Sequence, residues 1–332
     1  MGSDAILVIA VAAALAFGFT NGFHDTLDVI STAVSTGAAP PGVAIAAAAL
    51  LNFAGAFISI EVASTIAYDM VEAGAIEPVV VLAGLLGAIA WNLATWRLGL
   101  PSSSSHALIG GVVGATVAAA GTGAVLGGGL LDKVLTPALV APVLALALAL
   151  VGIVVLYRLV GRRRPGTVTR RFRHAQALSG GLLALGHGAN DAQKTMGVIV
   201  LAMVADGTLG EGADPPFWVI ASAAAAIGLG TYAGGWRIMR GARARVIKMD
   251  AAQGFSAQSA GAATILASTF MGFPISTTHA INGGVLGAGA VKRVSAARWG
   301  VAGNIVVAWV LTLPAAAAIG AVAYGVAWLL GA

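Results

Sequence analysis

The chain has 332 residues, of which 58% are hydrophobic and only 9% are charged, and its mean hydropathy is +0.92. A soluble globular chain has roughly a quarter charged residues, so this composition excludes that class and indicates an integral protein of the lipid bilayer. The absence of cysteine excludes disulfide and thiol chemistry. A net charge of +5 would suggest acidic partners in a soluble protein. Here its distribution along the chain matters more, and we expect no nucleic-acid partner.

The first apolar run has no basic leader, and we interpret it as a retained membrane helix. It is interrupted by NGFHDTLD, which contains Asn21, Asp25 and Asp28. A charge at the bilayer centre costs about 2.5–3.5 kcal/mol, so these side chains must face a wet or paired interior, and we expect a broken helix here. Asn21 and Asp25 offer hard oxygen ligands for sodium or a similar cation, whereas a carboxylate of Asp25 or Asp28 is an alternative proton carrier.

The segment 79–121 contains PSSSSHALIGG and starts and ends near acidic residues, which predicts a helical hairpin that enters and leaves on the outer side. Proline stops the first arm, and the hydroxyl groups of Ser103, Ser104 and Ser105 are suited to cap the helix that follows. Free amide hydrogens and the positive end of the helix dipole collect at such a turn. The turn is therefore a candidate anion site.

Basic and acidic segments alternate along the chain. Basic residues lie in three blocks, at 158–173, 237–248 and 292–298, and acidic residues collect at 68–78 and 205–216. By the positive-inside bias, the basic blocks are cytoplasmic and the acidic loops lie outside. The length suffices for roughly eight to twelve membrane segments, some of them short. We expect a multi-pass plasma-membrane protein with both termini outside.

The apolar run that follows the first basic block contains HGANDAQK. Its first five residues align with NGFHD, so that Asp191 is equivalent to Asp25. Asn190 and Asp191 are candidate cation ligands for the same reason as in the first copy. Lys194 occupies the position equivalent to Asp28, so the two are candidates for an ion pair. Alternatively, Lys194 neutralises a bound anion and Gln193 donates an amide hydrogen to it, or the whole set is a structural ion-pair network.

The segment 254–291 contains PISTTHAINGG between two basic blocks, which predicts a second hairpin that opens to the cytoplasm. Ser276, Thr277 and Thr278 repeat the capping pattern of the first hairpin. Two helix starts that converge from opposite sides suit a small tetrahedral oxyanion. We interpret His106 and His279 as structural, hydrogen-bonded neighbours of the turns.

The two hairpins belong to an internal repeat. Residues 99–115 and 272–288 are identical at ten of seventeen positions. Each half has a polar-interrupted first helix, a plain second helix, a hairpin and a closing helix, so an odd number of crossings gives the halves opposite orientations. The prediction is an all-α polytopic membrane protein with two inverted-topology repeats, a transporter architecture. Repeat 1 covers 1–157, a basic cytoplasmic connector 158–175, and repeat 2 covers 176–332.

The four motifs, in this order, resemble those of the inorganic phosphate transporter (PiT) family, and the similarity continues through KRVSAARWGVAGNIVVAWVLT. The resemblance covers nearly the whole chain. It implies uptake of inorganic phosphate coupled to sodium, to protons or to a metal–phosphate complex, with both termini outside. Two positions depart from the family pattern, since members often have asparagine at Asp28 and arginine at Gly37.

We therefore predict a secondary transporter that imports phosphate by symport with sodium or protons, through alternating access. The predicted phosphate ligands are Ser103, Ser104, Ser105, Ser276, Thr277, Thr278, Gln193 and Lys194. The predicted cation ligands are Asn21, Asp25, Asp28, Asn190 and Asp191, with Asp25 and Asp191 binding sodium if sodium is the coupling ion. Alternatives are another oxyanion such as sulfate, or a passive anion channel. We expect no enzymatic activity and no cofactor, and the sequence is compatible with a homodimer.

Overall fold

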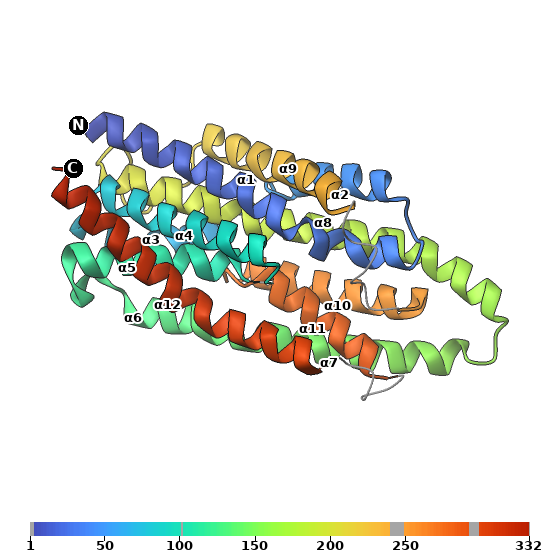
Figure 1. Ribbon diagram of the computed structural model, residues 1–332. Coiled ribbons are helices and arrows are strands. Elements are labelled where there is room, and N and C mark those ends of the chain that lie inside the picture. The colour runs from blue at the N-terminus through green and yellow to red at the C-terminus, as the bar shows by residue number, and fades with distance from the viewer. Residues whose placement is uncertain (1–2, 101, 240–248, 292–298, 332) are drawn as a thin grey trace.

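The computed structural model describes residues 3–100, 102–239, 249–291 and 299–331, and their regular structure is helical apart from one isolated bridge between Val71 and Val125 (Figure 1). The helices of the first half are α1 Ser3–Ser35, α2 Pro41–Gly55, α3 Glu61–Tyr68, α4 Pro78–Leu98, α5 Ser104–Ala120, α6 Gly127–Gly129 and α7 Thr136–Val160. Those of the second half are α8 Pro165–Ala205, α9 Phe217–Met239, α10 Ala251–Phe270, α11 Thr277–Ala290 and α12 Trp299–Leu329. The first half also contains two short 3-10 helices, η1 Ala73–Ala75 and η2 Thr122–Ala124, and a π-helix, η3 Leu130–Leu135.

Five helices within the described residues are long and apolar enough to cross a membrane: Asp4–Ser35, Pro78–Leu98, Gly127–Val160, Phe217–Gly235 and Val307–Leu329. The segment ending at Val160 has a mean hydropathy of 3.0, yet only 22% of its most apolar window is buried by the rest of the protein. Such a large exposed apolar face needs a lipid environment. These observations support an all-helical membrane protein, as the sequence predicted.

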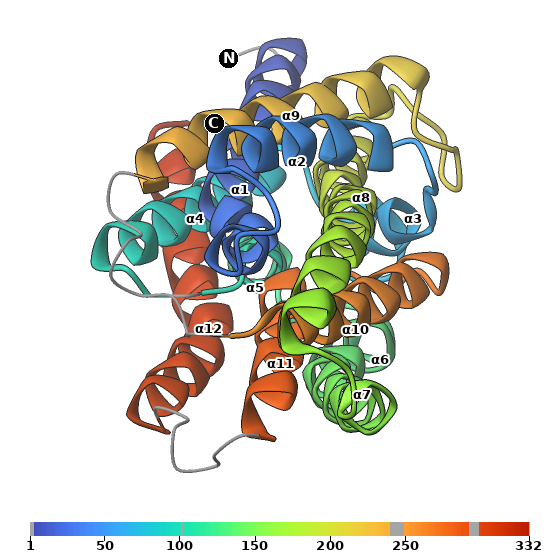
Figure 2. The ribbon, with the colours of Figure 1, turned by 90° about the vertical axis from the view of Figure 1, so that its right-hand side faces the viewer.

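The helices of the two halves pack against one another in a crossed pattern. The α4–α5 pair packs against α12, and the α10–α11 pair packs against α7. Likewise α1 packs against α9, while α8 packs against α2 and α3. An end-on view shows α1 and α8 in the middle, with α2 and α9 on one side and α5, α10 and α11 on the other (Figure 2). The two central helices are those with the charged motifs.

The turns of the two hairpins have the same local construction. Gly99 (φ +67°) and Gly272 (φ +73°) end the first arms in the left-handed region, where glycine is the favoured residue. Ser103 and Ser276 are the N-caps of α5 and α11, accepting hydrogen bonds from the third residue beyond, at 3.2 and 3.3 Å. The prediction that hydroxyl side chains cap both helices is confirmed. The α10 arm ends at Phe270, before the predicted Phe273, because Gly272 terminates it first.

The prediction of broken first helices is wrong. Helices α1 and α8 run without interruption through 21–25 and 187–191, because the polar side chains there find partners on other helices and the backbone has no need to open. The break lies instead in the second crossing of the first half, between α2 and α3, which the sequence analysis described as plain.

Glycines in both halves allow helix backbones to approach closely. A Cβ atom on Gly114 would overlap the Ala317 backbone of α12, and one on Gly287, its repeat equivalent, would overlap the Leu146 backbone of α7. The same contact thus occurs in both halves, and each hairpin packs against the closing helix of the other half. Close packing of this kind tolerates no added methyl group without displacement of a backbone.

Two glycines of α11 provide a test of this packing. Gly287→Ala should destabilise the protein by about 1–3 kcal/mol, the usual cost of overpacking. Gly289→Ala is the matched control, because its Cβ would have no neighbour within 4 Å among the described residues, and it should be neutral or favourable through helix propensity. Thermal unfolding of both variants in detergent measures the difference, and equal melting temperatures would refute the packing argument.

Candidate functional site

The charged motifs of α1 and α8 lie where the two hairpin turns meet. Asn21 and Asp25 of α1 and His187, Asp191 and Lys194 of α8 are all at most 1% exposed. Buried charges persist only when they are paired or hydrogen-bonded. The contacts of these five residues therefore define the candidate site.

Each hairpin contributes the first residue of its second helix to one carboxylate. The single hydroxyl hydrogen of Ser104 is shared between two acceptors, Asn21 Oδ1 at 2.7 Å and Asp25 Oδ2 at 3.1 Å from Oγ. Thr277 Oγ1 donates to Asp191 Oδ2, also at 3.1 Å. Ser104 and Thr277 are equivalent in the repeat, as are Asp25 and Asp191. The same hydroxyl-to-carboxylate contact thus occurs twice.

Lys194 connects both hairpins to α8. Its ammonium group donates to Ser105 Oγ at 2.5 Å and to the Ile275 carbonyl at 2.8 Å, and it forms an ion pair with Asp191. The suggested pair between Lys194 and Asp28 is therefore not formed, because Asp191, three residues before Lys194 on the same helix, lies within closer reach. Asp28 is half-buried and lies instead near Asp25 and Thr278.

His187, which the sequence analysis missed, completes the cluster of ionisable groups. His187 Nε2 lies 3.1 Å from Asp191 Oδ2 and 3.9 Å from Asp25 Oδ2, while Nδ1 lies 3.2 Å from Asn52 Oδ1. Ligand atoms of Asp25, His187 and Asp191 all lie within 4.8 Å of one another, close enough to hold one ion. His187 aligns with Asn21 in the repeat, and that alignment could have identified it.

The cluster also includes His24, whose Nδ1 lies 2.6 Å from Asp25 Oδ1. Two carboxylates face a single ammonium group, so the site has excess negative charge while its imidazoles are neutral. Carboxylate, amide and hydroxyl oxygens suit sodium, whereas the imidazoles add ligands for transition metals or acceptors for a proton. The chemistry of the site is that of a cation next to hydroxyl-rich helix starts.

Two predicted site residues support the architecture around the cluster. Asn190 Nδ2 donates to Thr269 Oγ1 and to the Phe273 carbonyl, both at 3.1 Å, and so holds the second hairpin turn against α8. Gln193 Oε1 accepts hydrogen bonds from the amides of Val62 and Ala63, at 2.8 and 3.2 Å.

Gln193 therefore caps α3, immediately after the break in the second crossing. Its Nε2 donates to the Ala189 carbonyl within α8. The Gln193 side chain is thus hydrogen-bonded to backbone groups of both α3 and α8, and its role as an anion ligand stays a prediction.

His106 and His279 pack against each other by their rings, with centroids 5.0 Å apart, and His279 stacks on Trp309 of α12 at 3.7 Å. Among the described residues, His106 Nδ1 and Nε2 and His279 Nε2 have no hydrogen-bond partner. The expectation that hydrogen-bonded imidazoles fix the turns is therefore wrong for His106, whose two ring nitrogens are both without a partner there. Ser103 and Ser276 fix the turns, and the histidines join the two hairpins and α12 through ring contacts.

Comparison with known proteins finds matches that extend over nearly the whole chain. A model described as the phosphate transporter family matches residues 21–167 and 161–320. A probable low-affinity inorganic phosphate transporter of Mycobacterium bovis is 48% identical over 98% of this chain and 78% of its own length. Proteins with the same description from Rhizobium meliloti and Bacillus subtilis are 47% and 42% identical, each over 96% of both chains.

The fold also matches a solved structure. A chain described as the sodium-dependent phosphate transporter superposes with a TM-score of 0.91, covering 98% of this chain and 99% of that one, at 24% sequence identity. The likeness at that identity concerns the fold. Together with the match of the family model to both halves, the identities over nearly the full length show that this chain belongs to the phosphate transporter family.

Proposed function

We propose that the protein is a secondary active transporter that imports inorganic phosphate together with a cation, sodium or a proton. The observation that supports this most directly is the double contact between hairpin hydroxyls and buried carboxylates, Ser104 with Asp25 and Thr277 with Asp191. Each of these hydrogen bonds joins a hydroxyl group suited to bind an anion to a carboxylate suited to bind a cation. Binding of either ion must therefore affect binding of the other.

The phosphate site is proposed at the starts of α5 and α11. Ser104, Ser105, Thr277 and Thr278 supply hydroxyl groups, and the helix starts supply backbone amides and the positive ends of their dipoles. Ser103 and Ser276 contribute as caps that keep the first turns open to the ligand. Lys194, bonded to Ser105 and Asp191, supplies a positive charge next to the anion.

Cation coupling follows from electrostatics. A phosphate at the hairpin hydroxyls lies next to Asp25 and Asp191, and two like unit charges 4 Å apart repel by about 4 kcal/mol at an effective dielectric constant of 20. Lys194 offsets one carboxylate only. A sodium ion or a proton among Asn21, Asp25, His187 and Asp191, with Asp28 and Asn190 close by, removes the remaining repulsion. A passive anion channel would gain nothing from such carboxylates.

Alternating access is proposed to use inverted-topology repeats. The hairpin turns meet in the middle of the molecule, and the α4–α5 pair extends from there toward the end that contains the start of α1, while α10–α11 extends toward the α7–α8 connector (Figure 1). The arginine-rich connector favours a cytoplasmic location, which puts both termini outside in the plasma membrane. In this orientation the α4–α5 hairpin enters the membrane from the outside, and the α10–α11 hairpin enters it from the cytoplasm.

A second candidate is import of a metal–phosphate complex. The grouping of two carboxylates with the imidazole of His187 favours it, since imidazole suits transition metals better than sodium. In that case the metal is part of the substrate. Uptake would then require a divalent metal and would not respond to a sodium gradient.

Loss of the hairpin hydroxyls tests the phosphate site. Thr277→Ala combined with Thr278→Ala should abolish phosphate uptake into proteoliposomes, because the anion loses two donors at the start of α11. Thr116→Ala combined with Thr264→Ala is the matched control, since both hydroxyls are buried in hairpin arms and lack a hydrogen-bond partner among the described residues. Uptake at the wild-type rate in the first double variant would remove these residues from the site.

Neutralisation of one carboxylate tests the cation site. Asp25→Asn should raise the cation concentration for half-maximal uptake by at least about 10–100-fold, since the loss of a residue that only hydrogen-bonds a metal ligand already has an effect of that size. Asp25 is chosen over Asp191 because its loss leaves the Lys194 ion pair intact. Asp132→Asn, which alters an exposed carboxylate, should leave the cation dependence unchanged. An identical cation response in both variants would exclude Asp25 as a ligand.

A further inference from the structure

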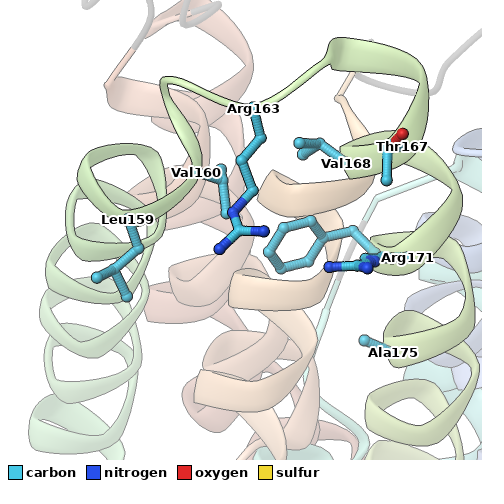
Figure 3. A pocket seen from close by; sticks show the side chains of 8 residues that line it. Leu159, Val160, Arg163, Thr167, Val168, Arg171 and Ala175 are labelled. Atoms are coloured by element: carbon cyan, nitrogen blue, oxygen red, sulfur yellow. The ribbon is translucent and has the colours of Figure 1, made fainter.

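A cavity that contains two arginines lies away from the candidate transport site, where α7 joins α8. It has a volume of about 390 Å³, within the range of small-ligand sites. Residues that line it include Leu159, Val160, Arg163, Thr167, Arg171 and Phe172. Arg163 enters from the connector and Arg171 from the first turns of α8, and both guanidinium groups point into the space between the two helices (Figure 3).

The charge of this cavity is uncompensated. The part of its lining that the structure describes contains no carboxylate. Among the residues that the structure describes, the guanidinium groups of Arg163 and Arg171 form no ion pair and no hydrogen bond. Two guanidinium groups and the hydroxyl of Thr167 are donors of the kind that bind a phosphate group, often in bidentate fashion. The cavity therefore favours a phosphate-bearing anion.

The rest of the lining is apolar, and it continues the lipid-facing surface of α7. Val151, Val155 and Leu159 lie one helical turn apart and are 62%, 47% and 68% exposed. On α8, Leu178 is 68% exposed, whereas the segment before Gln176 is mostly polar and exposed. The cavity thus lies at the level where the apolar belt ends. In a bilayer that covers this belt, its arginines would lie at the depth of phospholipid headgroups.

We propose that this cavity binds the headgroup of an anionic phospholipid, with the phosphate between Arg163 and Arg171 and the glycerol and first acyl carbons against Leu159, Val160 and Phe172. Free phosphate has no apolar part that could pack against this wall. Basic pockets between transmembrane helices on the cytoplasmic side are the usual sites for anionic headgroups. The apolar wall therefore favours a phospholipid over a free phosphate.

A lipid in this position would join the two halves of the protein. Leu159 and Val160 belong to α7, which packs on the α10–α11 hairpin, and Arg171 belongs to α8, which contains Asp191 and Lys194. Phe172 also contacts Phe255 of α10, with ring centroids 5.7 Å apart. The bound headgroup is expected to hold the connector, α7 and α8 in a fixed relation.

Native mass spectrometry of the full-length protein in detergent tests the proposal. The probes are phosphatidylglycerol, phosphatidylcholine of the same chain length, and inorganic phosphate as competitor. Wild-type protein should bind one phosphatidylglycerol in preference to phosphatidylcholine. Arg163→Gln with Arg171→Gln should weaken that binding about 30-fold, since each arginine near the membrane surface contributes about 1 kcal/mol.

Arg162→Gln with Arg164→Gln is the charge-matched control, because these neighbours in the connector do not line the cavity, and its affinity should remain near that of wild type. Equal weakening in both double variants would overturn the proposal in favour of diffuse charge attraction. Equal binding of the two lipids would also overturn it, as would displacement of phosphatidylglycerol by an equal concentration of inorganic phosphate. Phosphate uptake by the Arg163/Arg171 variant confirms that it is folded.

Discussion

The burial of Asp25 and Asp191 is the constraint on which the rest of the structure depends. Both carboxylates lie in the middle of long helices and are at most 1% exposed, and an uncompensated charge at that depth costs several kcal/mol. The hydroxyls of Ser104 and Thr277, the ammonium group of Lys194 and the imidazole of His187 offset this cost. Because the hydroxyls belong to the hairpin turns, compensation of the two charges also fixes where the hairpins end.

Close backbone packing makes that arrangement possible. Each hairpin reaches the central helices while its glycines press against the closing helix of the other half, as Gly114 does against α12 and Gly287 against α7. Under the proposed mechanism, a closing helix and the hairpin packed on it move together. Such a movement would change the distance between Ser104 and Thr277, and with it the affinity for the ions that lie between them.

Much of the site was predictable, because local chemistry and repeat symmetry are written in neighbouring residues. The proline and hydroxyl pattern predicted that a hydroxyl residue caps each second helix, as Ser103 and Ser276 do, and the repeat brought Asp25 and Asp191 into equivalent positions. Contacts between distant segments were not predictable. The helix break before α3 depends on Gln193, 131 residues away from Val62, and Lys194 selects Asp191 over Asp28 only once the helices are packed.

The central claim is that the negative charge of the site makes phosphate transport depend on a cation. Labelled phosphate uptake into proteoliposomes tests it most directly, with an inward sodium gradient, an inward proton gradient or neither. The account predicts accumulation above equilibrium with one of the two gradients and none without a gradient. Accumulation with sodium alone would assign the carboxylates to that ion, and accumulation with protons alone would assign them to proton transfer. Uptake that only equilibrates under all three conditions would contradict the account and favour a channel.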